Sequence, residues 1–449
     1  MSASQSTVSQ FGMQFSRRQM FGSIAAASTA LAIPTSLLAQ SAPSLAASHP
    51  DWQRISELLN GYVDRGEVAN IVVGLGYGAD DPVFLGRGFN SFAGQTPSDA
   101  DTLYRIYSMT KPVTGIATIM CIADGLISLD QPIADFIPGF ADMQVQKTYD
   151  GAITAENLEP AVRQITVRQC LTHTAGLGYS IVQQGPIAQA YDERGLVPAQ
   201  ASRLELPGVI GGNTTDSLED FANGLADMPL VYQPGTQWSY SVGLDLLGRV
   251  IEVASGKSFD GFLQERIFGP CGMNSTWFRV PESEAHRLTA NYAVADGTLL
   301  PIDLPGNSVY LDEPAFPFGG AGLVSSSHDY DRFLKMIANY GMIDGVRVMS
   351  EPAVRLATSD LTPDTVPQSG RFQFGPLTLG YGAGGAVGTG LLDGLYGWFG
   401  AASTAGLVNM NNGLRHNLMT QAMGLPQDGL PQQFVAAVAA DAARQAAAG

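Results

Sequence analysis

Residues 105–112 read Arg-Ile-Tyr-Ser-Met-Thr-Lys-Pro, and the helical pattern that follows them places Ser108 and Lys111 on one face of a helix. We predict this helix from Ser108 to about Asp124. Residues three apart on a helix have Cβ atoms about 5–6 Å apart. Pro112 fits the register, because proline is tolerated near a helix N-terminus but not in its interior. The spacing therefore predicts a hydroxyl and an amine that meet at the head of a helix.

A serine and a lysine in this arrangement suit nucleophilic catalysis. A neutral hydroxyl is a weak nucleophile and needs a base within hydrogen-bond reach. A buried amine can serve, because burial disfavours its charged form, and the helix start favours a developing oxyanion. Ser-x-x-Lys also occurs by chance, and a surface pair near a helix cap is the alternative. Of the chain's four lysines, however, only Lys111 has a serine three residues before it, and its neighbours are apolar.

Two further segments carry groups that suit the same reaction. Tyr240 lies in residues 234–242 (PGTQWSYSV), just before a helical pattern. Its phenol can act as a base beside a cation, although a core ring with a bonded hydroxyl is the alternative. In residues 397–404 (GWFGAAST), Gly400 and Ala401 would let a strand edge approach the serine and offer a backbone N–H to an oxyanion. An interior strand with a bend is the alternative there.

The flanking patterns predict a sheet assembled from both ends of the mature chain. Strands at the two ends with a helical insertion between them would place the active site in the seam. Alternating and helical spacings predict helices over 51–65 and 432–448, strands over 70–76, 82–86, 396–408 and 417–421, and mostly helices and loops over about 125–310.

Composition excludes several classes of function. The net charge of −17 repels phosphate backbones and anionic lipid, so nucleic-acid binding is not expected. The three cysteines are far apart and form no CxxC pair, so neither a disulfide framework nor a metal or redox motif is indicated. Gly256-Lys257-Ser258 resembles the end of a phosphate loop, but Ile251 stands where that loop needs glycine, so we reject nucleotide binding.

The first 46 residues are predicted to be a twin-arginine signal peptide. Arg17 and Arg18 precede an alanine-rich apolar stretch over residues 21–39, and Ser44-Leu-Ala46 is the expected cleavage site. An uncleaved membrane helix is the alternative, but Pro34 and the many small residues make a poor span, because about 20 apolar residues are needed. We therefore expect a periplasmic protein without a stable membrane anchor.

Five segments taken in order resemble the serine β-lactamase and penicillin-binding-protein superfamily. They are similar above all to its esterase branch, the family VIII carboxylesterases, which are class C β-lactamase-like. The five segments are 105–112 (RIYSMTKP), 171–177 (LTHTAGL), 233–240 (QPGTQWSY), 319–325 (GGAGLVS) and 397–402 (GWFGAA).

This resemblance implies a fold and a site. The fold would be α/β of the α+β type, with an antiparallel sheet, flanking helices and an all-helical region. Residues 47–449 would form one hydrolase domain, with sheet regions at about 47–124 and 311–449 and the helical region at about 125–310. The resemblance implies Ser108 as nucleophile, Lys111 and Tyr240 as its activating pair, and the backbone N–H groups of Ser108 and Ala401 as the oxyanion hole. His173 would belong to a structural loop.

Departures from the family pattern suggest the substrate. Lactamases of this plan carry Tyr-x-Asn and Lys-Thr-Gly, whereas this chain has Val242 and residues 398–400 (Trp-Phe-Gly) at those positions. A tryptophan cannot pair with a substrate carboxylate as a lysine does, and an aromatic wall favours neutral esters. We therefore expect Trp398, Phe399 and Gly400 to bind substrate, with Phe399 narrowing the pocket. Asp245 would orient the site, or would simply be an acid at a helix N-terminus.

The predicted activity is that of a serine carboxylesterase that hydrolyses small neutral esters through a Ser108 acyl-enzyme. A β-lactamase, a D-amino-acid peptidase and an acyltransferase are the enzymatic alternatives, and a penicillin-binding or penicillin-sensing protein is the non-enzymatic one. The absence of a Gly-x-Ser-x-Gly elbow argues against an α/β-hydrolase. No metal or organic cofactor is indicated. Which of Lys111 and Tyr240 is the base, and what the oligomeric state is, the sequence leaves open.

Overall fold

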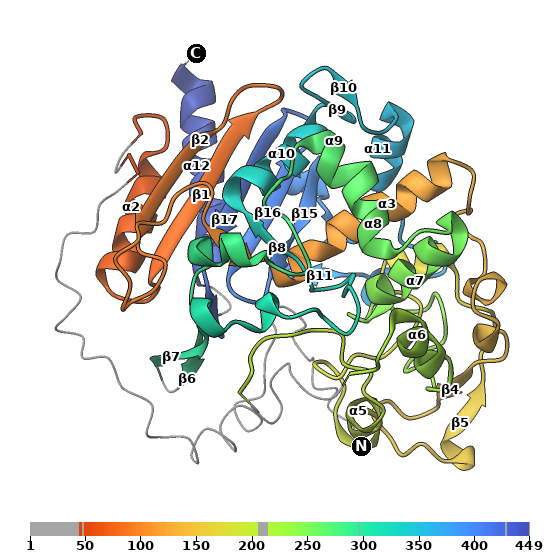
Figure 1. Ribbon diagram of the computed structural model, residues 1–449. Helices are drawn as coiled ribbons and strands as arrows, with labels where there is room; N and C mark the ends of the chain where they lie inside the picture. The colour runs from red at the N-terminus through yellow and green to blue at the C-terminus, as the bar shows by residue number, and fades with distance from the viewer. Residues whose placement is uncertain (1–44, 47–48, 205–213, 296, 427–428, 449) are drawn as a thin grey trace, which may run out of the picture.

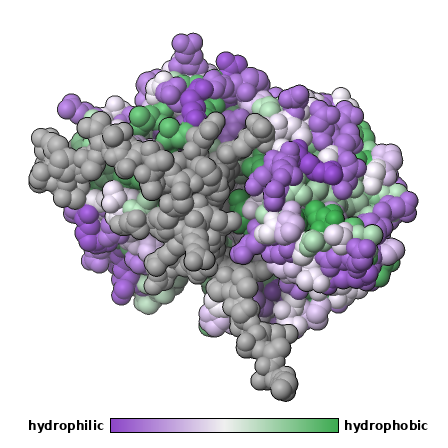
Figure 2. All heavy atoms as spheres, turned by 90° about the horizontal axis from the view of Figure 1, so that it is seen from below, coloured by the Kyte–Doolittle hydropathy of each residue, from purple (hydrophilic) through white to green (hydrophobic). Residues whose placement is uncertain are grey.

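The computed structural model describes residues 45–46, 49–204, 214–295, 297–426 and 429–448. The predicted signal peptide lies almost entirely outside these residues, so export remains a prediction. Within the described ranges, no helix combines the length and apolarity that crossing a bilayer requires. On the face drawn in Figure 2, hydrophilic side chains dominate and the apolar ones form small separate patches.

A seven-stranded antiparallel sheet forms the centre of the fold, as predicted (Figure 1). Its order is β13-β14-β15-β16-β17-β1-β2, so the strands of the C-terminal third pair with those of the N-terminal part through β17 and β1. The bounds are β1 Asn70–Tyr77, β2 Val83–Gly88, β13 Gly380–Tyr381, β14 Ala386–Val387, β15 Leu395–Gly400, β16 Thr404–Asn409 and β17 Leu414–Met419.

The predicted strands over 70–76 and 82–86 are confirmed, but two predictions near the C-terminus need correction. Residues 396–408 form two strands, β15 and β16, and not one, because the chain turns at residues 401–403. Ser403 takes a left-handed φ of 64°, which a continuous strand cannot accommodate. The strand expected over 417–421 begins earlier, at Leu414, and ends at Met419.

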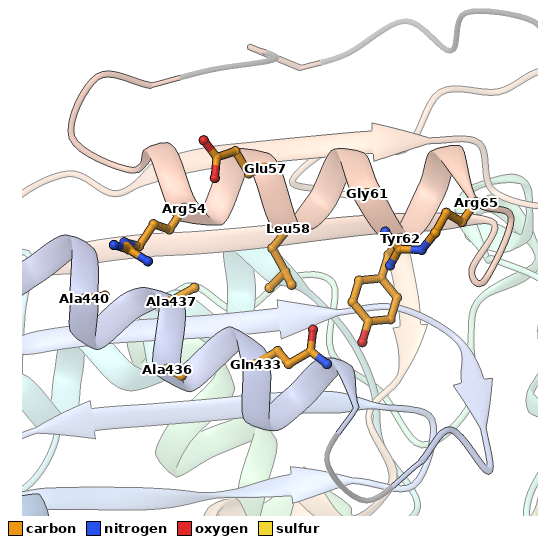
Figure 3. Close-up of a pocket in the computed structure, with 10 residues that line it drawn as sticks. All are labelled: Arg54, Glu57, Leu58, Gly61, Tyr62, Arg65, Gln433, Ala436, Ala437 and Ala440. Atoms are coloured by element: carbon orange, nitrogen blue, oxygen red, sulfur yellow. The ribbon is translucent and has the colours of Figure 1, made fainter.

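Helices cover both faces of the sheet. Neighbouring side chains of β1 point to opposite faces and so enter two different hydrophobic cores. Val72 belongs to the core under α3 and α10, whereas Val73 belongs to the core under α2 and α12. Helices α2 and α12 lie side by side, with a shallow groove of about 470 Å³ between them that contains none of the predicted site residues (Figure 3). The bounds are α2 Gln53–Asp64, α3 Thr110–Ala123, α10 Ser327–Ala338, α11 Glu351–Ala357 and α12 Leu430–Ala448.

Within the described residues, the middle of the chain contributes the remaining α-helices, together with two antiparallel strand pairs, β4–β5 and β6–β7, that the sequence did not predict. β6 and β7 pair with β18 in a three-stranded sheet, within the range expected to hold helices and loops. The bounds of the helices are α4 Val167–Leu171, α5 Gly185–Glu193, α6 Leu218–Ala226, α7 Gly243–Ser255, α8 Phe259–Leu263 and α9 Gly269–Cys271. Those of the short strands are β3 Leu103–Arg105, β4 Gln144–Gln146, β5 Leu158–Pro160, β6 Asn291–Ala295, β7 Thr298–Asp303, β8 Val324–Ser326, β9 Met342–Ile343, β10 Val346–Arg347, β11 Gln373–Phe374, β12 Leu377–Thr378 and β18 Ala422–Met423.

Candidate active site

Ser108 lies where β3 runs into α3. A short 3₁₀ turn over Tyr107–Met109 joins the strand to the helix, so the serine precedes the first α-helical residue. Arg105 anchors the end of β3: its buried guanidinium pairs with Asp303 and donates to the carbonyl of Thr289. Because strand and helix are both fixed in the core, the backbone holds the buried Ser108 hydroxyl in one place.

Lys111 approaches Ser108 from one helical turn further on, as the spacing predicts. Its Nζ lies 3.3 Å from Ser108 Oγ and donates to the carbonyl of Gly320 at 2.7 Å. Its Nζ also lies over the ring of Tyr240, 4.6 Å from the ring centroid. Lys111 is fully buried, so the carbonyl and the ring face replace its hydration shell.

Tyr240 completes the group from the loop that enters α7. Its hydroxyl donates to Ser108 Oγ at 2.8 Å, so the structure brings the serine, lysine and tyrosine together. The indole N–H of Trp398, on β15, donates to the Tyr240 oxygen at 3.3 Å. Aromatic rings surround the phenol: Tyr179, Trp238, Trp398 and the imidazole of His173 all lie within 6.1 Å of its centroid.

The end of β15 packs closely against the serine turn. A Cβ on Gly400 would overlap the carbonyl oxygen of Ile106 and the hydroxyl of Thr404, so only glycine allows this approach. Ala401, predicted for the oxyanion hole, directly follows the strand. A strand that ends against the nucleophile's own turn suits a backbone donor to an oxyanion.

The structure separates two of the residues predicted to bind substrate. Trp398 packs in the aromatic cluster beside Tyr240, whereas Phe399 packs against the core on the α2–α12 face and stacks on Phe374. The cause is alternation along β15, which sends neighbouring side chains to opposite faces of the sheet. The ring that lies beside Tyr240 is therefore that of Trp398, and the narrowing of the pocket by Phe399 stays a prediction.

His173 lies behind Tyr240, on the loop after α4. Its Nδ1 accepts the backbone N–H of Ser241 at 3.2 Å and lies 2.9 Å from the Ser241 hydroxyl. Burial, together with the charge of Lys111, holds the pKa of His173 well below its usual value, so the imidazole is neutral. Its bonds fix the residue that follows Tyr240, which suits a structural role.

Sequence reasoning did not single out Tyr179 or the carbonyl of Gly320. Tyr179 is buried, and its ring centroid lies 5.8 Å from Lys111 Nζ. Burial and the charge of Asp245 raise the pKa of Tyr179 well above its usual value, so it stays protonated. The glycine pair at 319–320 can be seen in the sequence. A backbone carbonyl that accepts a hydrogen bond can belong to any residue type, however, so the sequence alone cannot identify it. No group of three metal-ligating side chains occurs among the described residues.

Comparison with known proteins places this geometry in a family. The family model described as "Beta-lactamase" matches residues 55–441. Protein Rv1367c of Mycobacterium tuberculosis is 33% identical over 66% of this chain and 69% of its own length. Esterase EstB of Burkholderia gladioli is 30% identical over 55% of this chain and 60% of its own length.

Among solved structures, the chain resembles "EstCE1, a hydrolase with promiscuous acyltransferase activity". The TM-score is 0.68 at 20% identity, over 86% of this chain and 97% of that one. At this identity the likeness shows a shared fold. The family match covers most of the chain and includes all three residues that meet at Ser108. The chain therefore belongs to the beta-lactamase family of serine hydrolases and acyltransferases.

Proposed function

We propose that this protein is a serine carboxylesterase that hydrolyses small neutral esters through an acyl-enzyme on Ser108. The observation that carries the proposal is the meeting of three groups: Ser108 Oγ lies 2.8 Å from the Tyr240 oxygen and 3.3 Å from Lys111 Nζ. A nucleophile needs a proton acceptor within this reach, and here two candidates converge on one hydroxyl.

The proposed reaction has two steps. Ser108 Oγ attacks the ester carbonyl, and its proton passes to the Lys111–Tyr240 pair. The backbone N–H groups of Ser108 and Ala401 stabilise the oxyanion of the tetrahedral intermediate. That intermediate collapses, the C–O bond to the alcohol breaks, and the pair returns the proton to the departing oxygen. Water then attacks the acyl-enzyme by the same route and releases the acid.

The surroundings of Tyr240 favour neutral substrates. Trp398 occupies the strand position where lactamases of this plan carry a lysine, and it presents an indole N–H and an apolar ring. Lys111 donates to the carbonyl of Gly320 and lies beside Ser108, on the side of the reaction and not on the strand where lactamases of this plan bind a carboxylate. A carboxylate buried among these rings without a cationic partner would lose its hydration uncompensated.

The test is hydrolysis of p-nitrophenyl esters from acetate to octanoate, with nitrocefin assayed alongside. We expect turnover of the short esters, little of nitrocefin, and loss of activity in Ser108→Ala. Ser327→Ala is the matched control, because Ser327 is also buried and bonded, to Asn417 at 2.6 Å, but lies on α10. Ester hydrolysis by a folded Ser108→Ala variant at the wild-type rate would exclude the proposal.

Acyl transfer to an alcohol other than water is a second candidate. It is supported by the likeness to EstCE1, a hydrolase with promiscuous acyltransferase activity. The same acyl-enzyme serves both reactions, and the acceptor decides the product. Adding a primary alcohol to the ester assay separates them: a transferase forms the new ester in preference to the free acid, whereas a hydrolase does not.

A further inference from the structure

Two glycines are held between the helix that carries Lys111 and the helix that follows Tyr240. Thr114 on α3 donates its hydroxyl to the carbonyl of Gly319 at 2.6 Å, and Lys111 donates to the carbonyl of Gly320 at 2.7 Å. From the other side, the N–H of Gly320 donates to Asp245 Oδ1 on α7 at 2.7 Å. Residues 319–320 therefore form a bridge between Lys111 and Asp245.

The packing around this glycine bridge leaves no room for other residues. A Cβ on Gly319 would lie 2.7 Å from the carbonyl oxygen of Leu244, and one on Gly320 would overlap Asp245 Oδ2. The main chain of residues 319–320 is thus pressed against the start of α7. A shift of α7 or of Asp245 would displace Gly320, and with it the carbonyl that accepts from Lys111, because the N–H and the carbonyl of that residue are joined through its Cα.

Asp245 is buried at a cost that its position as a helix N-terminal acid does not explain. Its side chain is fully buried, and within the described part of the chain Oδ2 has no hydrogen-bond partner. Burial raises the pKa of Asp245 to about 6, while the charge of Lys111 and the N–H of Gly320 act in the opposite direction. A solvent-exposed acid would suit the start of α7 equally well, so the buried position needs another reason.

We propose that Asp245 is a positioning residue for Lys111: its Oδ1 holds the N–H of Gly320, and the carbonyl of the same residue then holds the amine beside Ser108. Asp245 does not touch the reacting atoms. It acts through two hydrogen bonds in series, each 2.7 Å long. The inference rests on the proposed function, because it concerns the geometry of the same nucleophile.

The accepting oxygen, and not the bulk of the side chain, is what this role requires. Asp245→Asn keeps an oxygen that accepts the Gly320 N–H, whereas Asp245→Ala removes it. We expect Asp245→Ala to lower kcat for p-nitrophenyl acetate about 100-fold with little change in KM, the loss typical of a misplaced catalytic group. Asp245→Asn should stay within about tenfold of the wild type, since a neutral acceptor bonds more weakly than a carboxylate.

Asp441→Asn is the matched control. Asp441 is also fully buried and accepts backbone N–H groups, those of Arg54 and Ile55 at 3.3 and 3.2 Å, but it joins α12 to α2. The Asp441→Asn substitution should alter the melting temperature and leave kcat unchanged. The rate of fluorophosphonate labelling of Ser108, followed by intact mass, reports nucleophile activation independently of turnover and should fall in parallel with kcat for Asp245→Ala.

Wild-type kcat in a folded Asp245→Ala variant would overturn the inference. An equal loss in Asp245→Asn and Asp245→Ala would overturn it as well, because the acceptor would then not matter. If Asp245→Ala does not fold, Gly320→Ala pushes residue 320 away from Asp245 and should lower kcat comparably; a fully active Gly320→Ala would refute the role. A wild-type protein that neither hydrolyses esters nor labels at Ser108 would remove the proposed function itself.

Discussion

His416 should make the stability of this protein sensitive to mild acid. The residue lies on β17 and faces α12, with its ring centroid 5.5 Å from that of Phe434. It is 3% exposed, and within the described residues neither ring nitrogen has a hydrogen-bond partner. Burial therefore lowers the pKa of His416 from 6.5 to about 4. The imidazole is neutral in the folded protein and resists protonation.

The direction of the effect follows from which state binds the proton first. As the pH falls below 6.5, the unfolded chain protonates at His416 while the folded chain does not, so the unfolded state is favoured. His416 therefore leaves the free energy of unfolding unchanged above pH 6.5 and lowers it progressively as the pH falls toward 4. With about 1.4 kcal/mol for each unit of separation between pKa and pH, the loss at pH 5 is about 2 kcal/mol.

The measurement is the free energy of unfolding in urea at pH 7.5 and pH 5.0, for the wild type and for His416→Leu. Leucine has a similar volume and no ionisable group, so the variant should lose about 2 kcal/mol less than the wild type over this interval. Contributions from His173 and from the carboxylates are common to both proteins and cancel. His286→Leu, at an exposed histidine, should behave as the wild type. Equal losses in the wild type and His416→Leu would refute the reasoning.

Two further predictions concern the nucleophile's surroundings. Trp398→Phe removes the N–H that reaches the Tyr240 oxygen and should lower kcat about three- to tenfold, the worth of one neutral hydrogen bond; an unchanged kcat would show that this bond does not act on the phenol. Gly400→Ala forces β15 away from Ile106 and should lower kcat for p-nitrophenyl acetate about 100-fold; full activity would show that the strand's approach is not required.

The parts of the fold that the sequence predicted are those fixed by local spacing. The apolar residues of α2 recur with helical spacing, and β1 and β2 are separated by a short turn, so both could be located without tertiary information. Ser108 and Lys111 are three residues apart, and helix geometry alone brings them to one face. Tyr240 comes to them from 132 residues away along the chain, and only the resemblance to a family indicated that meeting.

Where prediction failed, the deciding contact was remote. The break between β15 and β16 depends on a left-handed φ at Ser403, a conformation that residues with a Cβ seldom adopt and that the sequence pattern does not reveal. Alternation along β15 places Phe399 and Trp398 on opposite faces of the sheet. Which of these faces lies toward Ser108 is decided by the pairing of β15 with β16 and by the packing of β15 on the turn that carries the serine.

The glycine bridge is a second feature that depends on remote contacts and could not be predicted from the sequence. The atom of the bridge that contacts Lys111 is a backbone carbonyl oxygen, and its placement depends on Asp245. Asp245 follows Tyr240 by five residues, and this spacing indicates no contact with Lys111 until α7 is packed against α3. A buried carboxylate with an oxygen left unpaired is costly to keep, so it persists where an apolar residue would fail at something else. If that requirement is the position of the amine, then any residue at 245 that presents an accepting oxygen to Gly320 should preserve the nucleophile, and any that cannot should weaken it whatever its volume.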